Sequence, residues 1–454
     1  MTDEVTTRYV DECLSPDSRL RGIVRQARFP PRYTECFGDR LMPRPFFISK
    51  TEIRSSADDL AAIFDMLVSL PRRLFDGDIR RYCSALGFDD RRAALMQRLD
   101  GGRPVMFGRS DLYHDGASLK LLEFNVGSQL GGIDQAQVLP PLLELEPFRA
   151  FAAEHALGYV HTGQQIARAL RAAAEPVARG DEPVVALLEA NGALGPLLPL
   201  MLSFQEMLRG CGLDVRLGEV GQVRNRGGKL YLDGTPVDVV LRYFSVNQIC
   251  QDPLGEEALE PIVRAHEDGG TVLLTTLASF LFSSKACLAL LSDPRWRGAL
   301  SAAESARLDR VLPWTRNLEC GPAEVAGAAV DLIDYCRDNR ERLILKPCND
   351  FGGRGIVVGW DATDREWAEA LLAHCGKGYI VQERIRQRRE PVVDPSTGMR
   401  HDWVAAWSVF LTPDGYAGSH VRALPAGHQG IIGRGANAAT RVTGVFHYPA
   451  QDSH

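Results

Sequence analysis

The sequence predicts a mixed fold in which a small α/β domain lies between two α+β regions. Its 454 residues are enough for about three typical domains. Hydrophobic residues make up 45% of the chain and charged residues 24%, which is the balance of a folded globular protein and not of a disordered or fibrous one. Strand and helix patterns alternate between residues 180 and 276, and mixed patterns lie on both sides of this stretch.

Charge and cysteine usage narrow the class of protein. Lysine and arginine number 52 and aspartate and glutamate 58, so the formal net charge is −6, without the basic excess of a general nucleic-acid binder. The ten cysteines form no C-x-x-C pair, and no apolar run approaches about 18 residues. The first residues carry no apolar signal region. We therefore expect reduced thiols, no membrane span, a cytoplasmic location and small-molecule partners.

The first region, residues 1–180, combines helices with a β-rich stretch. Helical patterns run through 55–100, strand patterns through 104–126, and a long Ala- and Leu-rich helix is predicted at about 146–175. The following segment, EPVARGDEP, mixes proline, glycine and charge as linkers do, so we place a boundary near 180.

The second and third regions differ in type. Residues 181–276 predict a βαβ unit with strands at 183–189 and 213–220, a helix at 197–210, a hairpin around Asp233-Gly234, a strand at 238–244 and a last strand at 271–276. Residues 277–454 predict helices around 284–292, 322–339 and 365–375, strands at 342–347, 355–359 and 378–385, and two strands in 401–424 across a Pro-Asp-Gly turn.

A hairpin that carries two carboxylates is the most informative stretch. If its halves pair antiparallel around Ala117, Asp111 lies opposite Glu123 and Arg109 lies opposite Asn125. These four side chains then share one face, while Leu112, Leu122 and Phe124 point to the core. Opposed carboxylates repel unless a cation neutralises them, and two carboxylates with an amide are a hard-oxygen set suited to Mg²⁺. An ordinary hairpin with a solvated polar face remains the alternative.

A second candidate site is a glycine-rich loop that follows a predicted strand. That strand delivers Lys346, and the loop then contains Gly352, Gly353 and Gly355, whose backbone N–H groups can approach phosphate oxygens. Lys285 opens a predicted helix, where a cation opposes the helix dipole unless an anion is near. A structural loop and a surface lysine are the alternatives. At 378–385 the strand turns polar at Gln382-Glu383, which could contact adenine and ribose.

In combination these residues resemble the circularly permuted branch of the ATP-grasp superfamily, typified by the synthetase domain of glutathionylspermidine synthetase. Arg109-Ser110-Asp111 and Leu121-Leu122-Glu123-Phe124-Asn125 are similar to its R-x-D and LLE-x-N motifs, and they precede the phosphate loop instead of following it. The later matches are Lys285 in S-K-x-x-L-x-L-L, Lys346-Pro347 and Tyr379-Ile380-x-Gln382, so the resemblance runs in pieces from about residue 105 to residue 425.

The resemblance implies a fold and a set of roles. The fold would be a permuted ATP-grasp unit built from 1–180 and 277–454, with a Rossmann-like domain at 181–276 inserted between them. ATP and two Mg²⁺ ions would be bound, the metal by Asp111, Glu123 and Asn125, and the phosphates by Lys285, Lys346 and the loop glycines. Arg109, assisted by Arg422, would steady the reacting group.

The segment after Asn125 departs from the family. It reads Val-Gly-Ser-Gln-Leu-Gly-Gly where the synthetase has Asp-Thr-Pro, so we expect a different substrate. Ser128 and Gln129 in this segment, and Arg242 from the α/β domain, are the candidate substrate contacts.

The predicted function is an ATP-dependent ligase that joins a small-molecule carboxylate to an amine through an acyl phosphate, with two amino acids as the expected kind of substrate pair. A phosphotransferase on the same fold and a nucleotide-binding regulator without catalysis are the alternatives.

Overall fold

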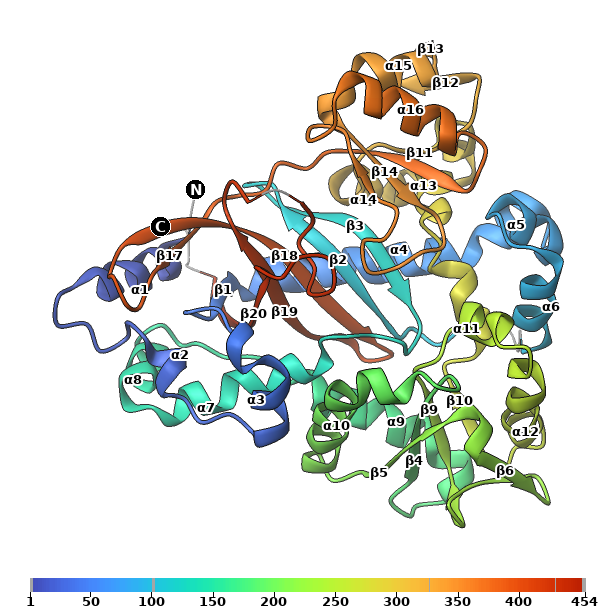
Figure 1. Cartoon of the computed structure of the whole chain (residues 1–454), viewed down its shortest axis with the longest axis horizontal. Coiled ribbons are helices and arrows are strands. Elements are labelled where there is room, and N and C mark those ends of the chain that lie inside the picture. Colours follow the sequence, from blue (N-terminus) through green and yellow to red (C-terminus); the bar gives the residue numbers. More distant parts are fainter. Residues whose placement is uncertain (1–2, 100–102, 326, 429, 451–454) are drawn as a thin grey trace.

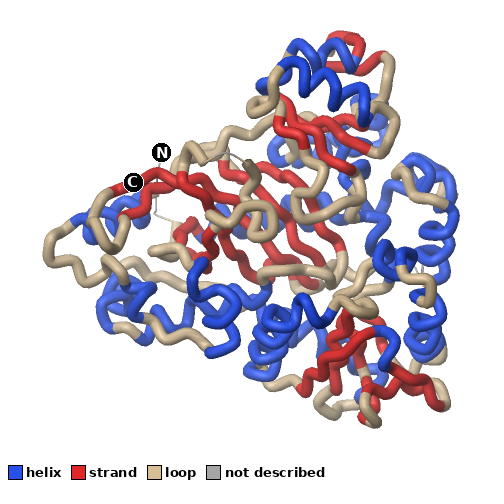
Figure 2. The backbone as a smooth tube through the Cα atoms, viewed as in Figure 1, coloured by secondary structure: helices blue, strands red, loops and turns tan. Residues whose placement is uncertain are grey.

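Three β-sheets organise the chain in the computed structural model, which describes residues 3–99, 103–325, 327–428 and 430–450 (Figure 1). A seven-stranded mixed sheet forms the centre. A four-stranded parallel sheet lies at the bottom of the view, and a four-stranded antiparallel sheet lies at the top. Helices surround all three, as the blue segments of Figure 2 show. None of the described helices is long and apolar enough to cross a membrane.

The central sheet is built from both ends of the chain. Its order is β1-β20-β19-β18-β2-β3, with β17 also paired to β18, and only β1 and β20 run parallel. The strands are β1 (Phe46–Ser49), β2 (Gly108–His114), β3 (Leu119–Val126), β17 (Glu390–Val393), β18 (Arg400–Thr412), β19 (Gly415–Pro425) and β20 (Arg441–Tyr448). The two strands expected across the Pro-Asp-Gly turn are confirmed as β18 and β19.

One face of this sheet is apolar and the other is polar. Helix α4 (Lys50–Phe75) crosses behind the sheet in Figure 1, and its Leu60, Ile63 and Leu67 share a core with Leu112 and Trp407. Helices α5 (Ile79–Ala85) and α6 (Asp90–Arg98) extend the same core. Around β1 and β20 a second core is closed by α1 (Glu4–Leu14), α2 (Ile23–Gln26), α3 (Pro31–Phe37), α7 (Leu139–Glu144) and α8 (Glu146–Glu154).

The parallel sheet is covered by helices on both faces. Its strands are β10 (Val272–Leu274), β9 (Val239–Arg242), β4 (Val184–Glu189) and β5 (Asp214–Glu219), in that order. Val185 and Leu187 face α9 (Thr162–Ala178) and α10 (Leu194–Gly210), whereas Ala186 and Leu188 pack in the core shared with α11 (Val246–Gln251) and α12 (Gly255–Glu267). This alternation confirms the βαβ pattern read from the sequence.

A small three-stranded sheet is attached to the parallel sheet. It consists of β6 (Val223–Arg226), β7 (Lys229–Leu232) and β8 (Thr235–Val237). The predicted hairpin is confirmed, since Leu232 pairs with Thr235 and both turn residues, Asp233 and Gly234, have positive φ.

The antiparallel sheet carries the predicted phosphate loop. Its order is β11 (Thr315–Asn317), β16 (Tyr379–Glu383), β14 (Leu343–Pro347) and β15 (Val357–Val358). The helices of this part are α13 (Lys285–Ser292), α14 (Ala302–Val311), α15 (Leu332–Asp338) and α16 (Asp364–His374). Short 3₁₀ turns complete the chain at η1 (Gly38–Arg40), η2 (Ile133–Val138), η3 (Val220–Gln222), η4 (Leu277–Phe282), η5 (Pro294–Ala299) and η6 (Arg340–Arg342).

Two predicted helices were wrong in extent. The helix expected at 146–175 is divided into α8 and α9, because Ala156 adopts a left-handed conformation and Gly158 forms a bridge with His447 beside β20. The helix expected at 322–339 contains only α15. Its first part is the hairpin β12 (Pro322–Val325) and β13 (Ala328–Asp331), which turns at Gly327 with a φ of 80°. Tertiary pairing and turn geometry override helix propensity at both places.

The expectation that all ten cysteines are reduced is also wrong. Cys320 and Cys375 form a disulfide with their Cα atoms 6.4 Å apart, and the other eight cysteines are thiols. The two residues are 55 positions apart, so their sequence spacing gave no sign of the pair. We expect a thiol-reactive dye to count eight thiols in the denatured, unreduced protein and ten after reduction. Ten thiols before reduction would contradict the pairing.

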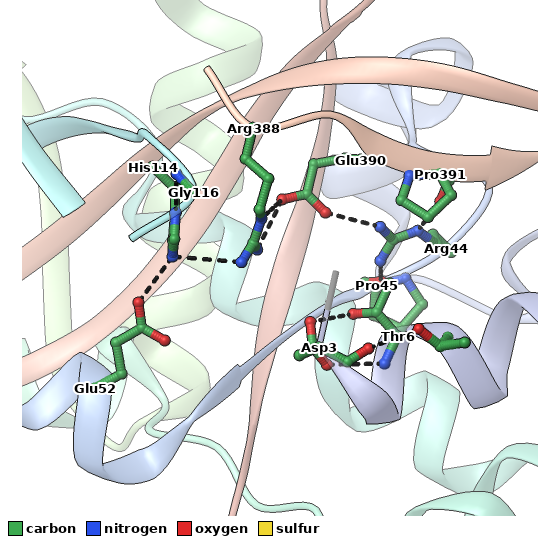
Figure 3. Close-up of polar contacts among 11 residues, drawn as sticks. Asp3, Thr6, Arg44, Pro45, Glu52, His114, Gly116, Arg388, Glu390 and Pro391 are labelled. Carbon is green, nitrogen blue, oxygen red and sulfur yellow. Dashed lines mark hydrogen bonds and ion pairs between the residues drawn. The ribbon is translucent and has the colours of Figure 1, made fainter. Parts of the chain in front are cut away.

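A buried chain of charges joins distant segments of the fold (Figure 3). The Arg44 guanidinium binds the Glu390 carboxylate at 3.2 Å, and Arg388 binds the other oxygen of Glu390 at 2.8 Å. His114 Nε2 then lies 3.3 Å from Arg388 Nη1 and 2.8 Å from Glu52 Oε1. The network ties the segment before β1 and the start of α4 to β17 and to the end of β2.

Candidate functional site

A cavity of about 1500 Å³ lies where the three sheets meet. Its wall combines the polar face of the central sheet, the loop after β3, the carboxyl end of β9 and the loop after β14. A single small ligand typically occupies a pocket of roughly 300–1000 Å³, so this space has room for more than one. Most of the candidate residues lie on its wall, and Lys285, Gly355 and Ser128 do not.

The carboxylate hairpin has the predicted register at its centre. Arg109 pairs with Asn125, and Asp111 pairs with Glu123. The same row continues across the sheet, because Asp111 also pairs with Ser408 and Ser408 pairs with His420. Four successive strands therefore place Glu123, Asp111, Ser408 and His420 side by side, and all of these except the fully buried Ser408 line the cavity.

One residue of the hairpin faces the opposite way from the prediction. The register shifts between Asp111 and Leu112, so that Leu112 pairs with Leu121. Leu121 is consequently buried in the core with Leu112 and Phe124, whereas Leu122 is half-buried on the cavity wall. A strict alternation cannot anticipate such a bulge, which moves every later side chain by one position.

Asp111 accepts three hydrogen bonds and forms one further ion pair. Arg109 binds both carboxylate oxygens, through Nε at 2.9 Å and Nη2 at 2.7 Å. Ser408 Oγ donates to Oδ1 at 2.8 Å, and Arg422 Nη2 lies 2.9 Å from Oδ2. Burial would raise the pKa of the Asp111 carboxyl, but the charges of Arg109 and Arg422 hold it well below its usual range. The carboxylate is therefore ionised, and both of its oxygens already have partners in the protein.

Glu123 is linked by a lysine to the phosphate loop. Lys285 Nζ lies 3.1 Å from Glu123 Oε2 and donates to the carbonyl of Asp350 at 2.8 Å. The ammonium also lies 5.4 Å from the centre of the Phe351 ring. Although Lys285 opens α13 as predicted, these anionic and aromatic partners offset the unfavourable helix dipole. Lys285 thus lies directly behind the wall of the cavity and positions the loop.

Lys346 projects from the end of β14 into the same region. Its Nζ donates to Gln382 Oε1 at 2.6 Å, and it is only 6% exposed. Burial lowers the pKa of Lys346 to about 8, partly opposed by the charge of Glu123. Gln382 also donates to Thr315 Oγ1 at 3.1 Å, so its amide positions Lys346 and is not free for a nucleotide. Glu383 remains partly exposed on the cavity wall and pairs with Arg342 at 3.0 Å.

The loop after Lys346 has the backbone that its glycines predict. Gly352, Gly353 and Gly355 all have positive φ, between 69° and 79°. A Cβ atom on Gly355 would lie 2.9 Å from the Tyr379 hydroxyl, so glycine is needed there for space as well as for conformation. Gly352 and Gly353 line the cavity, and Gly355 anchors the end of the loop against Tyr379.

The three candidate substrate contacts have different environments. Ser128 is fully buried, and its Oγ donates to the carbonyls of Arg242 and Leu274, so it joins the loop to the parallel sheet and does not face the cavity. Arg242 is 3% exposed and donates to the carbonyls of Thr275 and Phe244, although part of it reaches the wall. Gln129 is half-buried on the wall, where its amide bonds Gln248.

Several cavity residues were missed by the sequence reasoning. The loop between β19 and β20 carries Gly427, Gly430, Gly433 and Gly435, and it forms a second glycine-rich wall that includes Arg434. The repeated glycines of this loop were a signal that could have been noticed. His420 and Gln135 gave no comparable signal. Burial and the charges of Arg422 and Arg109 hold the pKa of His420 well below its usual range, so its ring is neutral.

Gly132 is required by the ring of His420. It has a φ of 85°, and an added Cβ would lie 2.7 Å from His420 Nε2. We expect Gly132→Ala to lower the free energy of unfolding, measured in urea, by about 1–3 kcal/mol through overpacking and left-handed strain. Gly116→Ala is the matched control, because its φ is 106° but nothing lies within 4 Å of the added atom. Equal losses in both variants would show that the His420 contact is unimportant.

A magnesium ion fits this site in part. No three His, Cys, Asp or Glu side chains among the described residues lie close enough to form a metal site on their own. Among the described residues, Lys285 is the one cation in an ion pair with Glu123. Asn125 donates through Nδ2 to Glu123 at 3.3 Å, which leaves the Asn125 amide oxygen as a ligand. Asp111 already accepts three hydrogen bonds and forms an ion pair with Arg422, so both of its oxygens are in use and it could bind a metal only if an arginine moved.

Comparisons with known proteins establish the fold. The sequence matches no protein-family model and no curated protein. Among solved structures it resembles a glutathione synthetase-like effector from Globodera pallida in its apo form, with a TM-score of 0.54, 14% identity, and 99% of this chain and 98% of that one covered. A putative gamma-glutamylcysteine synthetase from Methylobacillus flagellatus KT covers 82% of this chain and 85% of its own, with 16% identity and a TM-score of 0.40, too low to establish a shared fold. The chain has a mixed α/β fold similar to that of the glutathione synthetase-like effector.

Proposed function

We propose that this protein is an ATP-dependent carboxylate-amine ligase that forms an amide or peptide bond. The observation that carries the proposal is the meeting of Lys346 and Lys285 with Asp111 and Glu123 around one cavity, beside a glycine loop. The two carboxylates and the two lysines come from segments that lie far apart in the chain. Two cations with two carboxylates and a glycine-rich backbone suit a metal-bound triphosphate. On this proposal the chain is a permuted ATP-grasp unit with residues 181–276 inserted.

The cationic side of the cavity would bind the nucleotide. Lys346 and the backbone of Gly352 and Gly353 would hold phosphate oxygens, and Lys285 would keep the loop in place through Asp350. Magnesium would be held by Glu123 and Asn125, and when bound it would neutralise the phosphate charge. Asp111 would join it if Arg422 turned toward the substrate.

The centre of the sheet would perform the chemistry. A substrate carboxylate would attack the γ-phosphate of ATP and release ADP, and the amine would then attack the acyl carbon, displacing phosphate and losing one proton. Arg109 and Arg422 flank Asp111 at this point and could stabilise the negative charge of both steps. Asp111 would hold the two guanidinium groups in place, so that little reorganisation is needed during the reaction.

Assays with paired substrates test the proposal. We expect purified protein with Mg²⁺ to form ADP at a sustained rate only when both a carboxylate and an amine, such as two amino acids, are present. Sustained ADP formation with one substrate would instead indicate a phosphotransferase. ATP binding without turnover on any amino-acid pair would indicate a nucleotide-binding regulator.

A further inference from the structure

The cavity extends beyond the reacting centre to a region around β20, where a cation has no anionic partner. Arg434 is half-buried on the cavity wall, with its guanidinium 4.8 Å from the centre of the Phe37 ring and Nη1 3.2 Å from Cys36 Sγ. No carboxylate of the described residues lies within ion-pair distance of it. A partly desolvated cation of this kind gains most from an anion that enters the cavity.

An unpartnered amide faces the same region. Gln135 is 1% exposed and lines the cavity, and its Oε1 accepts a hydrogen bond from the Tyr33 hydroxyl at 2.7 Å. Within the part of the chain that the structure describes, its Nε2 makes no hydrogen bond of normal geometry, although the amide is close enough to Asp134 to lower the pKa of that carboxyl slightly. Leaving a buried donor unpaired is unfavourable, so a ligand acceptor at this place would be favoured.

The nearest fixed negative charge is screened from the cavity. Asp134 is buried, accepts from Ser203 Oγ at 2.9 Å, and is not part of the wall. Burial raises the pKa of its carboxyl to about 6, opposed by smaller effects of Ser203, Arg434 and the Gln135 amide. The Asp134 carboxyl therefore interacts with the Arg434 guanidinium only at a distance, from behind the cavity wall, and does not form an ion pair with it.

The remaining surface of this region is apolar. It is formed by Phe37 of α3, by Leu197 and Leu200 of α10, and by Val442 of β20. Val442 pairs with Arg422 on the neighbouring strand, and neighbouring strands lie about 4.8 Å apart. The apolar region thus begins about one strand spacing from the proposed reacting centre, a distance that a single amino acid spans.

We propose that this region is the binding subsite for an apolar amino acid that supplies the amine. Arg434 and Gln135 bind its α-carboxylate, the side chain packs against Leu197, Leu200 and Phe37, and the amino group points toward Arg422. The inference rests on the proposed ligase function and adds the class of one substrate to it.

Substrate analogues combined with two arginine variants test this subsite. In the wild-type protein, L-leucine should support ADP formation with a much lower KM than leucinamide, which lacks the carboxylate. Arg434→Met should raise the KM for L-leucine roughly 10- to 100-fold, leave kcat nearly unchanged, and hardly affect leucinamide. Arg441→Met is the matched control, because Arg441 donates to the nearby carbonyls of Ala438 and Thr440 and lies off the wall.

Binding without nucleotide separates this inference from the proposed function. Saturation-transfer NMR with L-leucine and the ATP-free protein should show a signal that Arg434→Met abolishes and Arg441→Met retains. If this result holds but no ADP forms with any pair, the ligase proposal fails and the subsite stands. If ADP forms but leucine and leucinamide behave alike in both proteins, the subsite is wrong and the ligase proposal stands. Equal leucine signals in wild type and Arg434→Met would also overturn the subsite.

Discussion

Asp111→Asn should lower the free energy of unfolding by about 3–5 kcal/mol, because it leaves two half-buried guanidinium groups without their shared, buried counter-charge. Arg109 binds both oxygens of Asp111 and Arg422 binds one of them, and the side chain is only 6% exposed. This is a large share of the roughly 5–15 kcal/mol that usually stabilises a domain. Urea unfolding followed by fluorescence measures the change. Loss of ADP formation in this variant would therefore combine a folding effect with a catalytic one.

The pH dependence of this effect has a definite sign. The pKa of Asp111 is held below its unfolded value, so its contribution is present above about pH 4 and is lost as the pH falls further. The difference in the free energy of unfolding between wild type and Asp111→Asn should accordingly become smaller from pH 7 to pH 3. Asp115→Asn is the control on the same hairpin, because Asp115 is exposed and an amide oxygen can replace its turn hydrogen bonds. Similar urea midpoints of unfolding for Asp111→Asn and Asp115→Asn would refute the structural role of Asp111.

Lys346→Met should lower kcat/KM for ATP by about 10²- to 10³-fold, the usual effect of removing one charged contact to a developing negative charge. The fold should be retained, since the variant removes a buried ammonium whose pKa is already lowered to about 8 by burial. Glu123→Gln offers a comparison at a less buried position, 25% exposed, where turnover should fall with little change in unfolding. Unaltered ATP kinetics in Lys346→Met would remove this lysine from the nucleotide site.

A titration of the wild-type protein gives independent evidence on Lys346. In the ATP-free protein its ammonium loses charge around pH 8, so kcat/KM for ATP should decline as the pH rises from 7 to 9. Lys346→Arg should keep its charge and show no decline over this range. A decline of the same size in both proteins would place the titrating group elsewhere.

The sequence predicted the carboxylate hairpin of the site better than the region around Arg434. Alternation along one hairpin was sufficient to place Arg109, Asp111, Glu123 and Asn125 on one face, since their neighbours are local in the chain. The bulge that turns Leu122 outward depends on packing between strands, which no local pattern records. Ser128 was misjudged for the same reason. It looks polar and accessible in the sequence, but the loop turns it toward carbonyl groups of the parallel sheet.

The region around Arg434 could not be predicted because its parts are distant in the chain. Phe37, Gln135, Leu200 and Val442 come from four separate elements and carry no shared motif. The disulfide between Cys320 and Cys375 presents the same difficulty. The α/β unit was easier, because its strands and helices follow one another and each is identified by its own hydrophobic pattern.

The pairing of β1 with β20 sets the order in which this protein can be completed on the ribosome. Strand β1 ends at Ser49, and its partner spans Arg441–Tyr448. At a synthesis rate of roughly 5–20 residues per second, tens of seconds pass between the synthesis of β1 and that of β20. The parallel sheet can form during that interval from residues 184–274. Glu390, the partner of Arg44, also arrives late. The nascent chain must therefore keep β1 and the buried Arg44 unpaired until Glu390 and β20 have been made, which predicts that chaperones bind the segment around β1 during synthesis.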